Sequence, residues 1–298
     1  MFAIGDLKRQ ARSKLRGRWG TAVLLTLVVG VIHILLNSAG IACDWDNISR
    51  FWGDFSFRWS GGFGFPRPGA LYGPPRGRLL SPLFSLINFF VTGAFSFALA
   101  RFYVLLCTSQ GDVTFGTFLE GLNRWGKGVR ALLLVSLRLF LWGLLILVLC
   151  GLVIGLCAVF LRVDRSDFIP IALRQGPLSA PAFVFIASLT ALFGTVVYIN
   201  RIIAYSQLMF LLAEYPTVSV SKCLRASVVM TRGHRFKLLL LEMSFAGWIF
   251  LSLLSAGIGF LWLIPYMTAA HVQAYRFLKE RAFADGAFVK EKNNPLPE

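Results

Sequence analysis

Residues 139–161 read LFLWGLLILVLCGLVIGLCAVFL, a run in which no residue is charged. At 1.5 Å of rise per residue, this run forms a helix of about 34 Å, which is long enough to cross the hydrocarbon core of a bilayer. Its apolar residues are continuous, whereas a strand of a membrane β-barrel would alternate apolar and polar residues. The stretch therefore predicts a transmembrane helix.

Four further apolar regions occur on either side of this run. They are residues 19–43, 79–100, 175–200 and 238–275, and the last is interrupted only by Glu242. The last region would form a helix of about 57 Å, which is too long for a single pass. Gly257-Ile258-Gly259 offers a break that divides it into two short spans. We therefore predict an all-α fold, a polytopic helical membrane bundle that forms one domain over residues 1–298.

The composition agrees with a membrane protein and excludes several other classes. Hydrophobic residues make up 56% of the 298 residues and charged residues only 15%. The mean hydropathy is +0.68. Because a soluble domain carries about 25% charged residues, these values exclude a soluble globular enzyme, a disordered chain and a disulfide-stapled secreted domain.

The distribution of basic residues decides between five and six spans, because Lys and Arg collect in cytoplasmic loops. With an inner N-terminus and six spans, 19 basic residues lie inside and 8 lie outside. With five spans the C-terminal tail moves outside, so that 14 basic residues lie inside and 13 lie outside. The sequence therefore predicts six transmembrane helices with both termini in the cytosol.

The net charge of +16 has the same explanation. Basic residues in cytoplasmic loops contact anionic lipids of the inner leaflet. They form no single cytosolic element interleaved with stacking aromatic rings, so we expect no binding to nucleic acid. The expected partners are the lipid bilayer, its anionic inner-leaflet lipids and, as a further candidate, another membrane protein.

Three segments lie outside the predicted spans. Residues 1–18 carry apolar residues at helical spacing among basic ones, which predicts an amphipathic helix on the inner membrane surface; a cleaved signal peptide is the alternative. Residues 44–78 form a long outer loop rich in glycine and aromatic rings, which suits either an interfacial flap or a functional lid. Residues 281–298 form a cytoplasmic tail.

Residues that could support catalysis are few. His33, His234 and His271 are far apart, and the five cysteines include no Cys-x-x-Cys pair. No phosphate-binding glycine loop and no nucleophile motif occurs along the chain. The sequence therefore predicts no enzyme, no cofactor and no metal site.

The informative residues are ionisable groups within or beside the apolar runs. A charge in the membrane is costly and is by default a functional candidate. The candidates are Arg101, Arg138, Arg201 and Glu242. Arginine side chains reach inner headgroups, but those headgroups would repel Glu242. We therefore hypothesise that Glu242 pairs with Arg201 or Arg138, which a swap of the two charges would test.

The segment from Glu214 to Lys237 predicts an inner loop that carries a short amphipathic helix. Pro216 ends the fourth span, and Ser219 or Ser221 is suited to cap a helix that runs to about Val228. Gly233 is suited to the left-handed conformation that follows many helices.

The two ends of the chain resemble a known family. The N-terminal match is DLKRQARSKLRGRWG, residues 6–20. The C-terminal match covers roughly residues 195–280, and its anchors are Tyr205, Glu214-Tyr215-Pro216, Ser227, Gly233-His234, Ser244-Phe245, Trp248, Gly257-Ile258-Gly259 and Pro265-Tyr266. On these residues the chain resembles the bacterial membrane proteins of domain-of-unknown-function family 975. The resemblance implies a six-helix integral membrane protein of a bacterial cytoplasmic membrane, and it implies no activity.

We expect a non-catalytic accessory or scaffold protein that works with a transporter, an envelope enzyme or lipid. The alternative is a small-solute or lipid transporter that uses the four intramembrane charges. A lipid-active enzyme would need two or more polar catalytic groups at one membrane face, and the sequence does not visibly bring such groups together.

Overall fold

The computed structural model describes residues 3–38, 80–108, 113–163 and 179–286, and every regular element within these ranges is an α-helix. The predicted outer loop, residues 44–78, lies outside the described residues, as do residues 287–298 of the predicted tail. The all-α prediction is confirmed.

Five of the described helical stretches are long and apolar enough to cross a membrane. They are Trp19–Ser38, Leu83–Thr108, Trp125–Leu156, Val184–Glu214 and Arg235–Leu254. The prediction of a multi-pass helical membrane protein is therefore confirmed in its general form. The sixth predicted span falls within α11 (Phe260–Ala284), which is not among these five.

Helix α11 is long enough to span a membrane, but polar residues such as His271, Gln273 and Arg276 lower its hydropathy. Much of the helix is nevertheless buried. Its fully buried residues include Ala269, Ala270, Val272, Ala274 and Tyr275. A helix that contacts mostly protein does not need the uniformly apolar surface that lipid demands. The count of six spans stays a prediction.

The described helices form two compact units. Among the described residues, the first, which we call the α3 unit, comprises residues 3–38, 80–108, 113–130 and 245–273. The second, the α6 unit, comprises the described residues 131–163, 179–244 and 274–286. Helices α5 (Trp125–Val163) and α11 contribute residues to both units. The single-domain organisation expected from the sequence stays a prediction.

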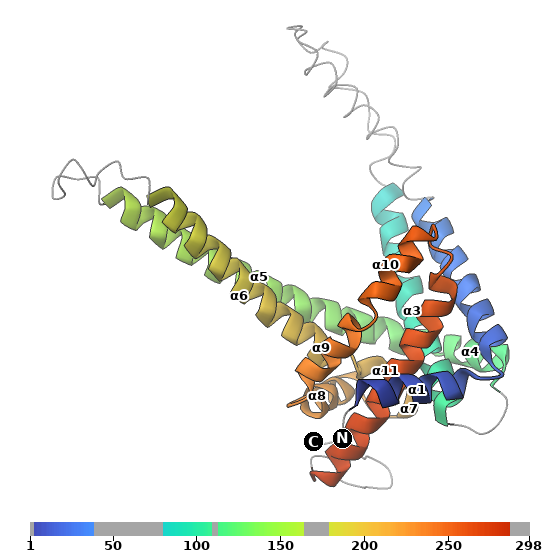
Figure 1. Cartoon of the computed structure of the whole chain (residues 1–298). Helices are drawn as coiled ribbons and strands as arrows, with labels where there is room; N and C mark the ends of the chain where they lie inside the picture. The colour runs from blue at the N-terminus through green and yellow to red at the C-terminus, as the bar shows by residue number, and fades with distance from the viewer. Residues whose placement is uncertain (1–2, 39–79, 109–112, 164–178, 287–298) are drawn as a thin grey trace, which may run out of the picture. The chain divides into compact units, whose positions relative to one another are not determined.

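The α3 unit begins with the basic helix that the sequence predicts, here α1 (Ile4–Leu15) (Figure 1). Its buried residues are Leu7, Ala11 and Leu15, which recur every fourth residue and so share one face. Its exposed positions include the basic residues Arg9 and Arg12. The apolar face of α1 is therefore buried, and basic residues lie on its other sides.

Two basic side chains of α1 hold it against the C-terminal part of the same unit. The Lys8 ammonium lies 4.1 Å from the centre of the Phe245 ring. Arg12 donates from Nε to the Tyr266 hydroxyl over 3.2 Å. Burial lowers the pKa of Lys8, and the neighbouring Arg12 charge lowers it further. The N-terminal helix is thus tied to residues that come more than two hundred positions later.

Glycines bring α3 (Leu80–Thr108) into backbone contact with α4 (Phe115–Leu122) and with the start of α5. A Cβ atom on Gly93 would lie 2.9 Å from Val129 Cα, and one on Gly121 would lie 2.9 Å from Ala98 Cα. A Cβ on Gly128 would overlap the Gly93 carbonyl oxygen. Such contacts are typical of membrane helices, where small residues allow close approach.

Polar side chains also join α3 to the helix Trp19–Ser38. His33 Nδ1 lies 3.1 Å from Asn88 Oδ1, and Asn88 Nδ2 donates to Asn37 Oδ1 over 3.1 Å. The His33 ring also packs edge-on against Phe95. His33 is therefore a hydrogen-bonded packing residue between two apolar helices.

The predicted break at Gly257-Ile258-Gly259 is present between α10 (Ala246–Leu254) and α11. Ala256 and Gly257 have φ angles of 52° and 88°, in the left-handed region that ends helices. The Gly259 amide donates to Ser255 Oγ over 3.0 Å, and the Phe245 ring packs edge-on against Tyr266. These contacts fold α10 and the first part of α11 into a hairpin.

In the α6 unit, the remainder of α5 runs beside α6 (Ser179–Tyr205) (Figure 1). The two helices touch at Ile146, which a Cβ on Gly194 would approach to 2.6 Å, and at Cys150, whose Sγ lies 3.9 Å from the Thr190 carbonyl oxygen. Apolar side chains elsewhere on the pair are open, and Phe193 is 71% exposed. Such a surface suits the bilayer interior.

The unit continues through α7 (Leu208–Glu214), α8 (Val220–Met230) and α9 (Arg235–Met243). Ser219 stands at the N-cap of α8, although its side chain makes no capping hydrogen bond. Gly233 has a φ of 75°, as predicted from its place after the helix. Ser227 Oγ donates to the Ala204 carbonyl oxygen over 2.8 Å and joins α8 to α6. The helix predicted in this segment is present, and its place on the inner side of the membrane stays a prediction.

Candidate functional site

Three arginines come together in the α6 unit, where α6 packs against both α8 and α9. Arg235 is the first residue of α9, and it donates from Nη1 to Asn200 Oδ1 over 2.5 Å. Asn200 directly precedes Arg201 in the sequence. The charges of Arg201 and Arg232 both act on the Arg235 guanidinium. We call Arg201, Arg232 and Arg235 the arginine cluster.

A tryptophan of α5 supports this cluster. The guanidinium carbon of Arg201 lies 3.8 Å from the centre of the Trp142 ring. The face of a tryptophan ring is the strongest aromatic site for a cation. Arg138 lies one helical turn before Trp142, so the two residues share a face of α5. Of the four predicted residues, Arg201 therefore contacts Trp142, and Arg138 lies on the same face of α5 as that ring.

The other two predicted residues have different surroundings. Glu242 lies on the exposed side of α9. Its pairing with Arg201 or Arg138 stays a prediction. Arg101 lies in the α3 unit and forms an ion pair with Glu120, with 3.4 Å between Nη2 and Oε2. The Glu120 side chain is 67% exposed, so water screens this ion pair and the pair contributes little to stability.

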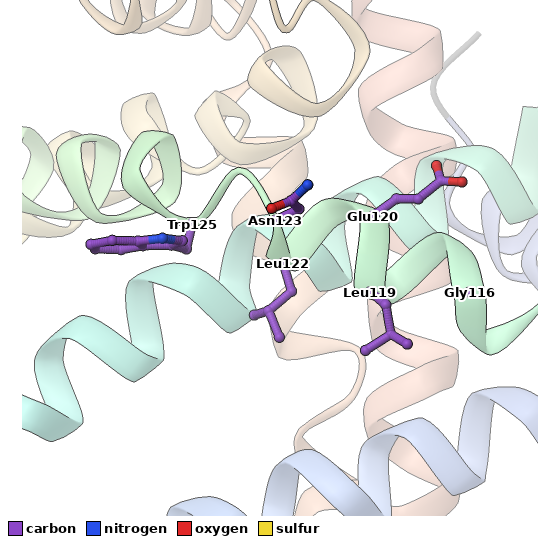
Figure 2. Close-up of a pocket in the computed structure, with 6 residues that line it drawn as sticks. All are labelled: Gly116, Leu119, Glu120, Leu122, Asn123 and Trp125. Carbon is purple, nitrogen blue, oxygen red and sulfur yellow. The ribbon is translucent and has the colours of Figure 1, made fainter.

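Glu120 also belongs to a shallow depression of about 630 Å³ in the α3 unit. Its lining consists of Gly116, Leu119, Glu120, Leu122, Asn123 and Trp125. Figure 2 shows that Leu119 and Leu122 point to one side of α4 while Glu120 points to the other. Leu119 and Trp125 are about half exposed, which is typical of side chains at a membrane interface. The depression therefore joins apolar side chains to one carboxylate that Arg101 already engages.

A second polar site in the α6 unit has a carboxylate at its centre. Glu214, at the end of α7, accepts hydrogen bonds from the Tyr275 hydroxyl and from Lys279 Nζ, the latter over 2.5 Å. Tyr275 and Lys279 lie one turn apart on α11, so both reach the same carboxylate. We call these three residues the Glu214 clamp. The clamp fastens the end of α11 to α7.

Aromatic rings surround the clamp. The Phe210 and Tyr275 rings lie 5.8 Å apart, and Lys279 Nζ lies 5.7 Å from the centre of the Tyr215 ring. Burial raises the pKa of the Tyr215 phenol, and the Glu214 carboxylate raises it further, while Lys279 acts in the opposite direction. Tyr215 is therefore neutral at physiological pH, and Glu214 and Lys279 supply the charges of the clamp.

Sequence reasoning missed most of these partners. From the sequence, Arg232 and Arg235 are predicted only to lie beside lipid headgroups, close to the helix end at Gly233. Tyr275 and Lys279 were not considered, although polar residues four apart on an apolar helix share a face. Within the described part of the chain, no three His, Cys, Asp or Glu residues lie together as a metal site would require.

A family model described as "Protein of unknown function (DUF975)" matches residues 1–282. The match extends through the middle of the chain as well as the two ends that carry the resemblance seen in the sequence. No curated protein and no solved structure matches the chain.

Proposed function

The chain belongs to the DUF975 family, and from this premise and the geometry above we propose that it is a non-catalytic accessory protein that binds another membrane protein. The observation that carries the proposal is an exposed face of small residues on the pair of helices α5 and α6. Small residues on membrane helices allow close packing with a partner helix.

On α5 this face contains Gly151 and Gly155, spaced four apart, and nothing lies within 4 Å of a Cβ placed on either. On α6 it contains the exposed residues Ser188, Ala191 and Thr195. Successive residues of a helix are about 100° apart, so the contacts between α5 and α6 fix the direction in which each other residue lies. By this count, the two residues on α5 and the three on α6 fall on the same side of the helix pair. We call these five residues the small-residue face. Lipid alone does not require small residues in this arrangement.

Purification tests this proposal. The full-length tagged chain, extracted in mild detergent from its own membrane, is expected to retain a second membrane protein in stoichiometric amount by native mass spectrometry. The Gly151→Leu/Gly155→Leu variant fills the small-residue face, and we expect it to lower the retained partner by about tenfold.

The matched control places bulk on another exposed side of α5. Leu145 and Leu149 are also four apart and exposed, so Leu145→Phe/Leu149→Phe is expected to retain the partner. Equal retention by both double variants would contradict the small-residue face as the binding surface. A chain that is always alone, or paired only with a second copy of itself, would contradict the accessory role.

We also propose six spans, with α9 and α10 together as the fifth, the first part of α11 as the sixth, and both termini in the cytosol of a bacterial cytoplasmic membrane. The hairpin at residues 255–259 supports this arrangement, as does the excess of basic residues in the segments assigned to the inside. Green fluorescent protein fused after Glu298 is therefore expected to fluoresce, and alkaline phosphatase at the same place is expected to be inactive. Active phosphatase with a dark fluorescent fusion would establish five spans instead.

A small-solute or lipid transporter is the second candidate, because Arg201 contacts Trp142 and Arg138 lies on the same face of α5 as that ring. Transport requires a water-accessible route to such charges. A water-soluble thiol reagent that labels Glu242→Cys from the outer side in intact cells would favour this candidate. Protection of that cysteine would favour the accessory role.

A further inference from the structure

With α5 and α6 crossing the membrane as proposed, Arg138 and Arg201 lie at a definite depth. Helix α5 carries no charged residue from Leu139 to Leu161, and α6 carries none from Ser179 to Asn200. Each stretch is about 33 Å long, slightly more than the thickness of the hydrocarbon core of about 30 Å. Arg138 and Arg201 therefore lie where the hydrocarbon ends and lipid phosphates begin.

The arginine cluster concentrates positive charge at this level. Arg201 rests on a ring face, and Arg235 donates to the neutral Asn200 amide. A ring face and an amide orient guanidinium groups but do not neutralise them. Neighbouring guanidinium groups repel one another, and an anion bound between them would offset this repulsion.

Unused hydrogen-bond donors are also present. Arg235 Nε is buried, and no acceptor for it occurs among the described residues. Helix α9 begins at Arg235 without a side-chain cap, so its first amide N–H groups have no partner within the helix. Both features add donors for an anion to a site that already carries three positive charges.

We propose that the arginine cluster binds a phosphate group at the inner surface of the membrane. Arginine is suited to this role because its planar guanidinium donates two parallel hydrogen bonds to phosphate oxygens. Asn200 and Trp142 are positioning residues that fix the orientations of Arg235 and Arg201. The phosphate belongs either to an anionic lipid or to a water-soluble compound that reaches the same surface.

Lipid titration of the purified full-length protein tests the proposal. The melting temperature is measured in uncharged micelles against phosphatidylglycerol, against diacylglycerol, which has no phosphate, and against inorganic phosphate. We expect stabilisation by phosphatidylglycerol and none by diacylglycerol. Arg232→Gln is expected to weaken this binding by about tenfold, because hydrogen bonds to a charged group are lost.

Arg232 is exposed, so the variant is expected to melt like the wild type in phosphate-free micelles. Arg225→Gln is the matched control, because it removes the same charge from an exposed position on α8 and should bind normally. Arg232→Lys keeps the charge but loses the paired donors, so it should recover only part of the affinity.

Stabilisation by inorganic phosphate alone, lost in Arg232→Gln, would keep the site and make its ligand a soluble compound. Equal weakening by Arg225→Gln and Arg232→Gln would overturn the proposal, since general attraction would then explain binding. The inference rests on the proposed function only for the membrane placement of α5 and α6. Arg232 lies outside the small-residue face, so loss of the partner protein and loss of phosphate binding are separate results.

Discussion

Gly128→Ala is expected to destabilise the protein by about 1–3 kcal/mol, although it adds only one methyl group. The new Cβ would overlap the Gly93 carbonyl oxygen and would lie 2.7 Å from Phe97 Cβ. Because the first obstacle is backbone, α3 and α5 must separate to admit it. The melting temperature in detergent and the yield of monodisperse protein are the measurements.

A nearby glycine provides the control for this prediction. Gly126 lies on the same first turns of α5, and nothing lies within 4 Å of a Cβ placed there. Gly126→Ala should leave stability unchanged or raise it by up to about 1 kcal/mol, because alanine favours the helix. The two alanines should therefore have opposite effects. A Gly128→Ala protein as stable as the wild type would show that α3 and α5 are not in backbone contact.

Glu214→Ala should destabilise the protein by about 2–3 kcal/mol, because it removes the acceptor for two donors. Tyr275 is 0% exposed, and the Lys279 side chain is only 19% exposed, so water replaces the lost carboxylate poorly. Glu214→Gln should have a smaller effect, because the amide oxygen still accepts one hydrogen bond. Chemical or thermal unfolding in micelles measures these differences.

Glu280→Ala is the control for the clamp, since it removes a carboxylate from an exposed neighbour of Lys279. It should change stability by less than about 0.5 kcal/mol. Lys279→Met combined with Glu214→Ala should be more stable than Glu214→Ala alone, because the unpaired ammonium is gone. Additive effects of the two substitutions would argue against direct coupling.

Local features were predicted well from the sequence. The helix within residues 1–18, the left-handed Gly233 and the break at Gly257-Ile258-Gly259 all depend on spacing or backbone freedom, which a sequence displays directly. The lipid-facing spans were equally clear, because lipid contact requires continuous apolar residues.

Partners across the fold were harder to predict. The sequence placed Arg138 and Arg201 in or beside apolar runs but did not indicate Trp142, since only packing decides which residue of α5 meets α6. Lys279 and Tyr275 were missed because a polar residue near the end of an apolar run is usually read as a boundary. The four predicted residues therefore indicated where part of the arginine cluster lies, but not the ring and the amide that orient its guanidinium groups.

The contact between α1 and residues near the other end of the chain has a consequence for biosynthesis. Arg12 and Tyr266 are separated by 254 residues. At ribosomal speeds of about 5–20 residues per second, α1 leaves the ribosome roughly ten seconds to a minute before Tyr266 exists. During that time Lys8 and Arg12 lack the aromatic side chains of Phe245 and Tyr266 as partners. The final seating of α1 therefore has to wait until translation is almost complete.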